Sequence, residues 1–190
     1  MLKALLVGIV LGAALVLGGI WMYFTTGRAP VATTDPPLPF ERKIAHAALN
    51  AHLDREVRSG PAVPADETNF LAGAEVYKQH CAVCHGLPGA EPTHISQGMY
   101  PKPPELFKGT GVTDDPAWET YWKAAHGIRM TGMPGFQGRL TEAQLWQVSH
   151  LLANADKISP AVRAALAAPV AIATPAAPSA TVVPTKWPTT

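Results

Sequence analysis

The pattern of hydrophobic and polar residues begins with a long apolar segment. Residues Ala4–Phe24 carry no charge and are mostly apolar, and a helix needs about 20 such residues to cross a bilayer. Trp21, Tyr23 and Phe24 close the segment, as aromatic residues do at a membrane interface. The pattern predicts a transmembrane anchor over residues 1–28.

A cleaved signal peptide is the alternative interpretation of this segment. Signal peptides have shorter apolar cores and end in small residues, whereas this segment is long and ends in bulky aromatic residues. We therefore favour a retained anchor. Lys3 and Arg28 place one basic residue on each side of it, so the flanking charges do not determine its orientation.

Residues 29–65 are predicted to connect the anchor to a folded domain. Ala29–Pro39 is rich in Pro, Thr and Ala, which is typical of an extended tether. Phe40–Ser59 contains no Gly or Pro and predicts an accessory helix with a thin apolar stripe. That helix would pack on the domain that follows or on a partner. Gly60–Pro64 interrupts the chain again.

Residues 66–158 have the pattern of a helical domain, without the alternation that is typical of strands. Residues 87–111 hold many Pro and Gly residues, which predicts a loop. Helices are expected at about Asn69–His80, with Asp66, Thr68 or Asn69 as the cap, and from a capping Asp115 and Pro116 to near Gly127. A third helix is expected from a Thr141/Gln144 capping box to about Asn154. Residues 159–190 are expected to form a short helix from Ser159 and a disordered tail rich in Ala and Pro.

The composition restricts the classes of function. A chain of 190 residues with a formal net charge of +1 suits one compact domain with appendages. A protein that binds nucleic acid usually has a basic face, and this balance of charge gives no indication of one. The sequence has 2 cysteines, which are too few for a disulfide framework and lie three positions apart.

The two cysteines belong to Cys81-Ala82-Val83-Cys84-His85, and Cys-x-x-Cys-His is a haem attachment motif. Its two thiols add to the two vinyl groups of haem and become thioethers, and the histidine that follows binds the iron. A redox dithiol is one alternative, but such sites usually adjoin a strand. Half a zinc site is another, but the sequence has no second cysteine pair. The motif therefore predicts one covalent haem c with His85 as an iron ligand.

The second axial ligand is expected to be a methionine, since a His/Met pair is common in cytochromes and raises the reduction potential. Met133 is preferred because Gly132 and Pro134 let the backbone approach the haem and then hold it rigid. Met130 in the same loop and Met99 are weaker candidates, and any methionine can simply fill a core.

A ligating histidine normally donates its second ring N–H to a carboxylate or a carbonyl. Pro103-Pro104-Glu105-Leu106 can supply such a carbonyl, and Leu106 would then pack on the haem edge. An ordinary Pro-rich loop is the alternative interpretation of these residues.

Residues 69–155 resemble a class I cytochrome c, the family with one haem, an N-terminal CxxCH motif and a C-terminal Met ligand. The helix Leu145–Leu152 resembles the family's last helix, although Leu151 stands where an aromatic residue is usual. The other matching pieces are Gly73-x-x-x-Tyr77, Pro104-Glu105-Leu106 and Met133-Pro134-Gly135-Phe136.

The resemblance implies an all-α cytochrome c fold, with three main helices around the haem and one exposed haem edge. It also implies that Pro104 O bonds His85 and that Met133 is the second ligand. Haem c is attached after export, so the chain is expected to cross the inner membrane once, with Met1 inside and the haem domain in the periplasm.

Electron transfer is the function that this ligand set favours, because a six-coordinate iron has no open position for a substrate. We expect a carrier in a respiratory or related chain, without enzyme activity of its own, that exchanges electrons with redox protein partners. One alternative is a haem subunit of a larger membrane oxidoreductase, such as a terminal oxidase or a dehydrogenase. The other is an open-site haem enzyme or gas sensor, which requires that no methionine binds the iron.

Overall fold

The computed structural model describes residues 1–56, 60–108 and 114–169. These residues form helices and loops, with an isolated bridge between Gln137 and Leu140 and no strand among them. The predicted all-α class is therefore confirmed. Parts of three predicted segments lie outside the described residues. These parts are residues 57–59 of the accessory helix, residues 109–111 of the loop, and the disordered tail.

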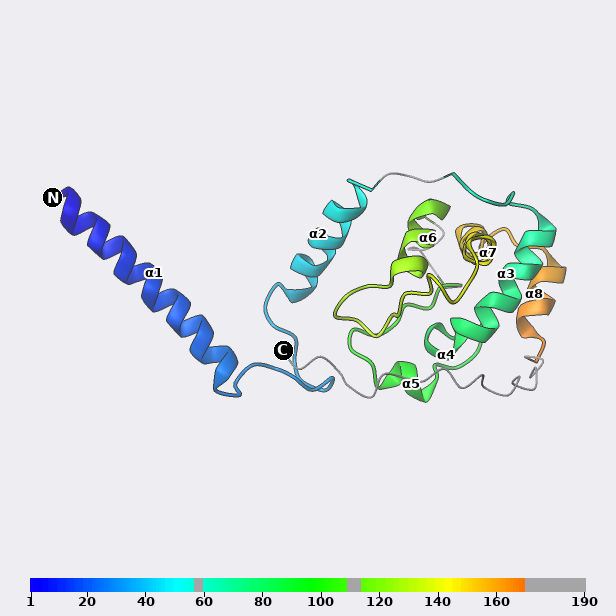
Figure 1. The fold of residues 1–190 in the computed structure, drawn as a ribbon. Helices are drawn as coiled ribbons and strands as arrows, with labels where there is room; N and C mark the ends of the chain where they lie inside the picture. Colours follow the sequence, from blue (N-terminus) through cyan, green and yellow to red (C-terminus); the bar gives the residue numbers. More distant parts are fainter. Residues whose placement is uncertain (57–59, 109–113, 170–190) are drawn as a thin grey trace, which may run out of the picture.

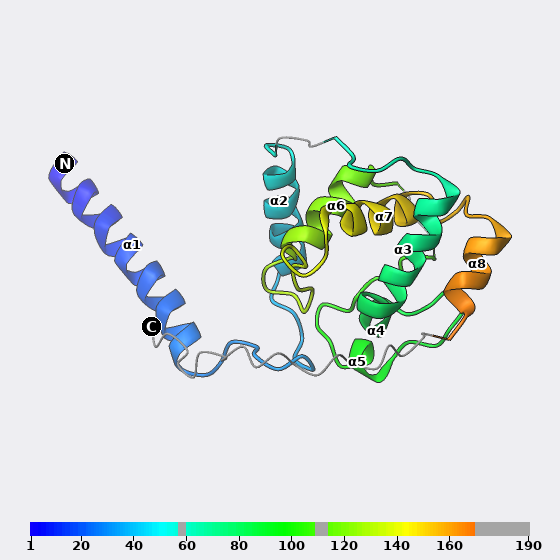
Figure 2. The same cartoon turned by 45° about the vertical axis from the view of Figure 1, so that its right-hand side comes forward.

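Helix α1 (Leu2–Thr25) stands apart from the rest of the chain (Figures 1 and 2) and buries none of its residues. In the described part of the chain it is the one helix that is long and apolar enough to cross a membrane. An N-terminal signal sequence passes the same test of length and composition. The structure thus forms the predicted apolar segment as one continuous helix.

The core forms where α3 (Glu67–His80) crosses α7 (Glu142–Ala153), with α6 (Ala117–His126) packed on α7. Figure 1 shows these helices gathered on one side of the molecule, away from α1. The side chains of Tyr77 on α3 and Leu151 on α7 are fully buried. Leu151, which replaces the expected aromatic residue, is therefore a core residue at this crossing.

Gly73 lets α3 and α7 approach closely. A Cβ atom at this position would overlap the carbonyl oxygen of Gln147 and lie 2.7 Å from its carbonyl carbon. Both are backbone atoms of α7, which cannot move without separating the helices. Gly73 is thus required by the crossing, in spite of the low helix propensity of glycine.

Two of the three main helices begin with a capping residue that the sequence predicts. Asp66 caps α3 through a bond from Asn69 N at 2.9 Å, and Thr141 and Gln144 form the predicted capping box of α7. Asp115 is the exception, because α6 has no side-chain cap. Its carboxylate instead accepts a hydrogen bond from Lys123 Nζ at 2.9 Å.

Helix α2 (Glu41–Leu53) lies within the predicted accessory helix and packs on the helical domain at its C-terminal end. Leu53 is buried there, and the rings of His52 and Trp122 lie 5.1 Å apart. Figures 1 and 2 both show α2 beside α6. The first turn of α2 remains exposed, including Phe40 and Ile44.

Two short helices refine the expected organisation. Helix α8 (Pro160–Ala167) packs on α3, and Val162 and Leu166 are fully buried, so α8 shares the core although the expected domain ended at residue 158. Helix α5 (His94–Gln97) is a single turn inside the predicted loop.

Candidate functional site

The CxxCH motif forms a tight turn at the end of α3. Cys81 follows the last residue of α3 and precedes α4 (Ala82–His85). Its carbonyl oxygen accepts hydrogen bonds from the backbone N–H groups of Cys84 at 3.1 Å and His85 at 2.9 Å. The turn brings both cysteines and His85 together within one turn of helix, and both thiols are free.

The pKa of Cys81 is shifted in the direction opposite to that of a reactive thiol. Burial, and to a lesser extent the neighbouring Cys84, raise the pKa of the Cys81 thiol to about 12. Reactive and metal-binding cysteines need the thiolate, which a depressed pKa provides. The described residues also contain no group of three or more His, Cys, Asp or Glu that could hold a metal ion. Both observations disfavour a dithiol or zinc site.

The imidazole of His85 is oriented by a backbone carbonyl. His85 Nδ1 lies 2.8 Å from Pro104 O, so the ring donates its Nδ1–H and keeps the lone pair of Nε2. Burial lowers the pKa of His85, and the bond to Pro104 opposes this change without reversing it. The ring is therefore neutral at pH 7, with one nitrogen free to bind a metal ion.

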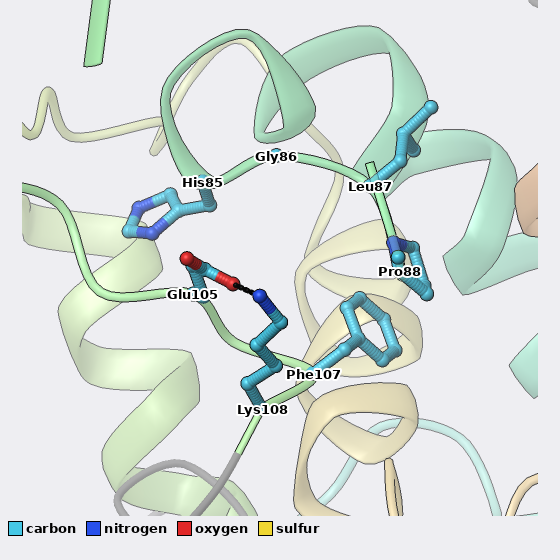
Figure 3. Close-up of a pocket in the computed structure, with 8 residues that line it drawn as sticks. His85, Gly86, Leu87, Pro88, Glu105, Phe107 and Lys108 are labelled. Carbon is cyan, nitrogen blue, oxygen red and sulfur yellow. Dashed lines mark ion pairs between the residues drawn. The ribbon is translucent and has the colours of Figure 1, made fainter. Parts of the chain in front are cut away.

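Two pockets border this histidine. A cavity of about 220 Å³ borders Cys84 and His85 and extends to Gln97 and Lys102. A small pocket that also borders His85 is lined by the Glu105–Lys108 ion pair and Phe107 (Figure 3).

The segments that follow His85 and Pro104 are fixed to the core through Tyr77. Its hydroxyl donates a hydrogen bond to Gly86 O at 2.7 Å, and its ring meets Phe107 edge to face with centroids 5.0 Å apart. Leu106 and Phe107 pack against the core. Tyr77 thus contacts both segments that hold the imidazole, the one after His85 and the one after Pro104.

The methionine loop folds back on the end of α6. Gly127 has φ +70°, and a Cβ atom there would lie 2.6 Å from Gly135 N, so this close approach suits only glycine. Ile128 N donates to Met133 O at 3.2 Å, and Thr131 Oγ1 accepts from Met133 N at 3.1 Å. The backbone of Met133 is therefore held on both its N–H and its C=O side.

The three candidate methionines differ in their surroundings. Met130 is 92 % exposed and has φ +59°, so its side chain makes little contact with the fold. Met133 is half-buried. Met99 is also half-buried, and its methyl group lies against Gly132. The structure places Met99 against the loop that carries Met133 and leaves Met130 in solvent.

Another contact joins the methionine loop to the attachment motif. His80 directly precedes Cys81, and Phe136 follows Met133 in the loop. The centroids of their rings lie 5.8 Å apart. This contact places the expected ligand loop beside the cysteines, although the two are far apart in the sequence.

Residues 68–152 match the model of a family described as cytochrome C oxidase, cbb3-type, subunit III. These residues form a c-type cytochrome domain. The match includes the CxxCH motif, the Pro104 segment and the Met133 loop, and it leaves out α1, α2 and α8. No curated protein and no solved structure matched the chain.

A cytochrome domain carries haem c, covalently bound and containing iron, and functions in electron transfer. The residues of this domain fit that group. They include two free thiols in one turn, a neutral imidazole with its Nδ1–H already donated, and a thioether on a braced loop. Nitrogen and thioether sulfur are the donor atoms of a His/Met haem site.

One residue that supports the cytochrome site was missed from the sequence, and another was expected only as the end of a helix. Thr131 binds the backbone of Met133, and a threonine two positions earlier in a Gly-containing loop is a recognisable turn signal. Gly127 ends α6 with a positive φ, which is the usual role of a glycine after a helix.

Proposed function

We propose that this chain is a single-electron carrier that uses one haem c with His85 and Met133 as axial ligands. The observation that carries the proposal is the hydrogen bond from His85 Nδ1 to Pro104 O at 2.8 Å. It fixes the ring orientation and tautomer that an axial ligand needs and makes the ring a better electron donor. Cys81 and Cys84 would form the thioether bonds.

Met133 is proposed as the second ligand because its loop is held in one shape. The bonds at Met133 N and Met133 O and the approach of Gly127 to Gly135 restrict its backbone. A ligand that is already positioned loses little conformational freedom on binding. Met130, at 92 % exposure, has no comparable support.

The haem supplies a reversible one-electron change at its iron. The chain would hold it through the two cysteines, orient His85 through Pro104 and present the thioether of Met133. If His85 and Met133 both bound the iron, no position would remain for oxygen or another substrate. This supports a carrier over an open-site enzyme or sensor.

A redox titration of the haem-loaded, full-length protein tests this function. We expect one reversible transition that follows a one-electron Nernst curve, and a low-spin spectrum in both oxidation states. We also expect the reduced protein not to bind carbon monoxide at pH 7. Rapid carbon monoxide binding by the reduced protein would contradict the carrier and favour an open haem site.

The membrane arrangement is part of the proposal. We infer that α1 is retained in the inner membrane as a single span, with the cytochrome domain in the periplasm, where haem c is attached. The length and apolar surface of α1 support this. The carrier would exchange electrons with donor and acceptor proteins of a respiratory or related chain.

A role as a subunit of a larger membrane oxidoreductase is the second candidate. The matched family is described as an oxidase subunit, and α1 and α2 add an apolar helix and an accessory helix outside the matched residues. Such elements suit attachment to a membrane complex.

Native electrophoresis of solubilised membranes distinguishes a free carrier from a subunit of a complex. After mild solubilisation and native electrophoresis, the carrier is expected to migrate alone, as a membrane-bound species that keeps residues 1–28. Constant comigration with other redox subunits would instead establish the subunit. Release from the membranes by a carbonate wash, together with an N-terminus beyond residue 28, would show a cleaved signal and contradict the anchor.

A further inference from the structure

The side chain of Met99 occupies the space that Gly132 leaves free beside the expected ligand. A Cβ atom at Gly132 would overlap Met99 Cε and lie 3.6 Å from Met99 Sδ. Gly132 directly precedes Met133, so the end of the Met99 side chain packs against the backbone that presents the thioether. Methionine suits this position because its flexible chain fills irregular gaps.

Met99 is itself tied to the haem attachment motif. It lies two residues after α5, and its backbone N–H donates to Ser96 O at 3.4 Å. Thr93 caps α5 by accepting from Ser96 N at 3.1 Å, and its hydroxyl donates to Val83 O at 2.7 Å, inside the CxxCH motif. A short chain of contacts therefore leads from the motif through α5 to the methionine loop.

These contacts differ from the hydrogen bonds that shape the loop itself. The bonds at Met133 join it to Thr131 and Ile128 of the same loop, so they set the shape of the loop but not its distance from the motif. The contact of Met99 with Gly132 crosses from the motif side to the loop, as does the ring contact of His80 with Phe136.

We propose that Met99 is a positioning residue for Met133 and holds the ligand loop against the haem attachment motif. This inference rests on the proposed His85/Met133 ligation. Loss of the Met99 side chain leaves a gap beside Gly132, and the loop can then move away from the motif. The bond from Met133 to the iron becomes easier to displace, although Met133 itself is intact.

Displacement of the methionine by imidazole, followed optically in the oxidised holoprotein, measures this effect. We expect Met99→Ala to bind imidazole about tenfold more tightly than wild type, the change that a loss of about 1.4 kcal/mol produces. The charge-transfer band of the methionine–iron bond should weaken. Met99→Leu, which conserves most of the volume, should restore both properties, and Met130→Ala should match wild type.

Gly132→Ala offers a second test that does not remove a methionine. Its Cβ enters the space of Met99 Cε, so we expect a higher imidazole affinity in this variant. In the double variant Gly132→Ala/Met99→Ala the alanine methyl partly fills the gap. The change in imidazole affinity of the double variant should therefore be smaller than the sum of the changes in the two single variants. Full additivity would contradict direct contact between these residues.

The results separate this inference from the proposed ligation. Wild-type imidazole affinity and an unchanged band in Met99→Ala would overturn the positioning role, even if its thermal stability falls. If the band is absent from wild type, or survives in Met133→Ala, the ligation itself is wrong. Complete loss of the band in Met99→Ala with retention in Met133→Ala would overturn both, since Met99 would then be the ligand.

Discussion

Met133→Ala is expected to convert a low-spin haem into a high-spin haem that binds carbon monoxide when reduced. The substitution removes the thioether and leaves His85 with its bond to Pro104, so one axial position of the iron opens. The reduction potential should fall, because methionine ligation raises it.

Axial ligands tune haem potentials over about 0.8 V. The variant Met133→His is expected to lower the reduction potential by on the order of 0.1 V.

Optical spectra of the oxidised and reduced holoproteins, with and without carbon monoxide, measure this outcome. Met130→Ala is the matched control, because Met130 belongs to the same loop but is 92 % exposed, and its spectrum should equal that of wild type. An unchanged low-spin spectrum in Met133→Ala would disprove the ligand assignment. Loss of the low-spin form in Met130→Ala would transfer the assignment to that residue.

Gly73→Ala is expected to destabilise the domain by about 3 kcal/mol, at the upper end of the usual cost of overpacking a core. Alanine in place of glycine normally stabilises a helix by about 1 kcal/mol, so the intrinsic preference has the opposite sign. The steric term prevails because the new methyl group meets backbone atoms of Gln147. Backbone atoms cannot rotate away as the end of a side chain can.

Denaturant unfolding of the holoprotein measures this change in the free energy of unfolding. Gly60→Ala is the matched control, because a Cβ atom at Gly60 has no heavy atom within 4 Å and its φ is not positive. Its stability should stay within about 0.5 kcal/mol of wild type, as for most surface substitutions. A similarly small change in Gly73→Ala would show that α3 and α7 cross less closely than described.

The sequence was sufficient where the signal is local. The capping box at Thr141 and Gln144 sets the start of α7 within a few residues. The spacing of Cys81, Cys84 and His85 predicts haem attachment, and the structure places these residues within a single turn. The length of the apolar segment alone predicts α1. Each of these features depends on neighbouring residues, so its pattern is visible without the fold.

Sequence signals failed in two places. Asp115 has the residue type of a helix cap, yet Pro116 is the N-cap residue of α6, and the carboxylate of Asp115 pairs with Lys123 on the same helix. The sequence predicts α8 as a short helix outside the domain, but Val162 and Leu166 are fully buried in the core that includes α3. Burial against a distant helix has no signature in a short segment.

By itself, then, the sequence determined the all-α class and the apolar N-terminal helix and predicted haem c attachment at Cys81–His85, because short-range spacing and length encode these features. Only the tertiary structure placed the carbonyl of Pro104 at His85, left Met130 in solvent and brought Met99 against the Met133 loop. These outcomes depend on how distant loops pack around one site, and no local pattern specifies the distance between two loops.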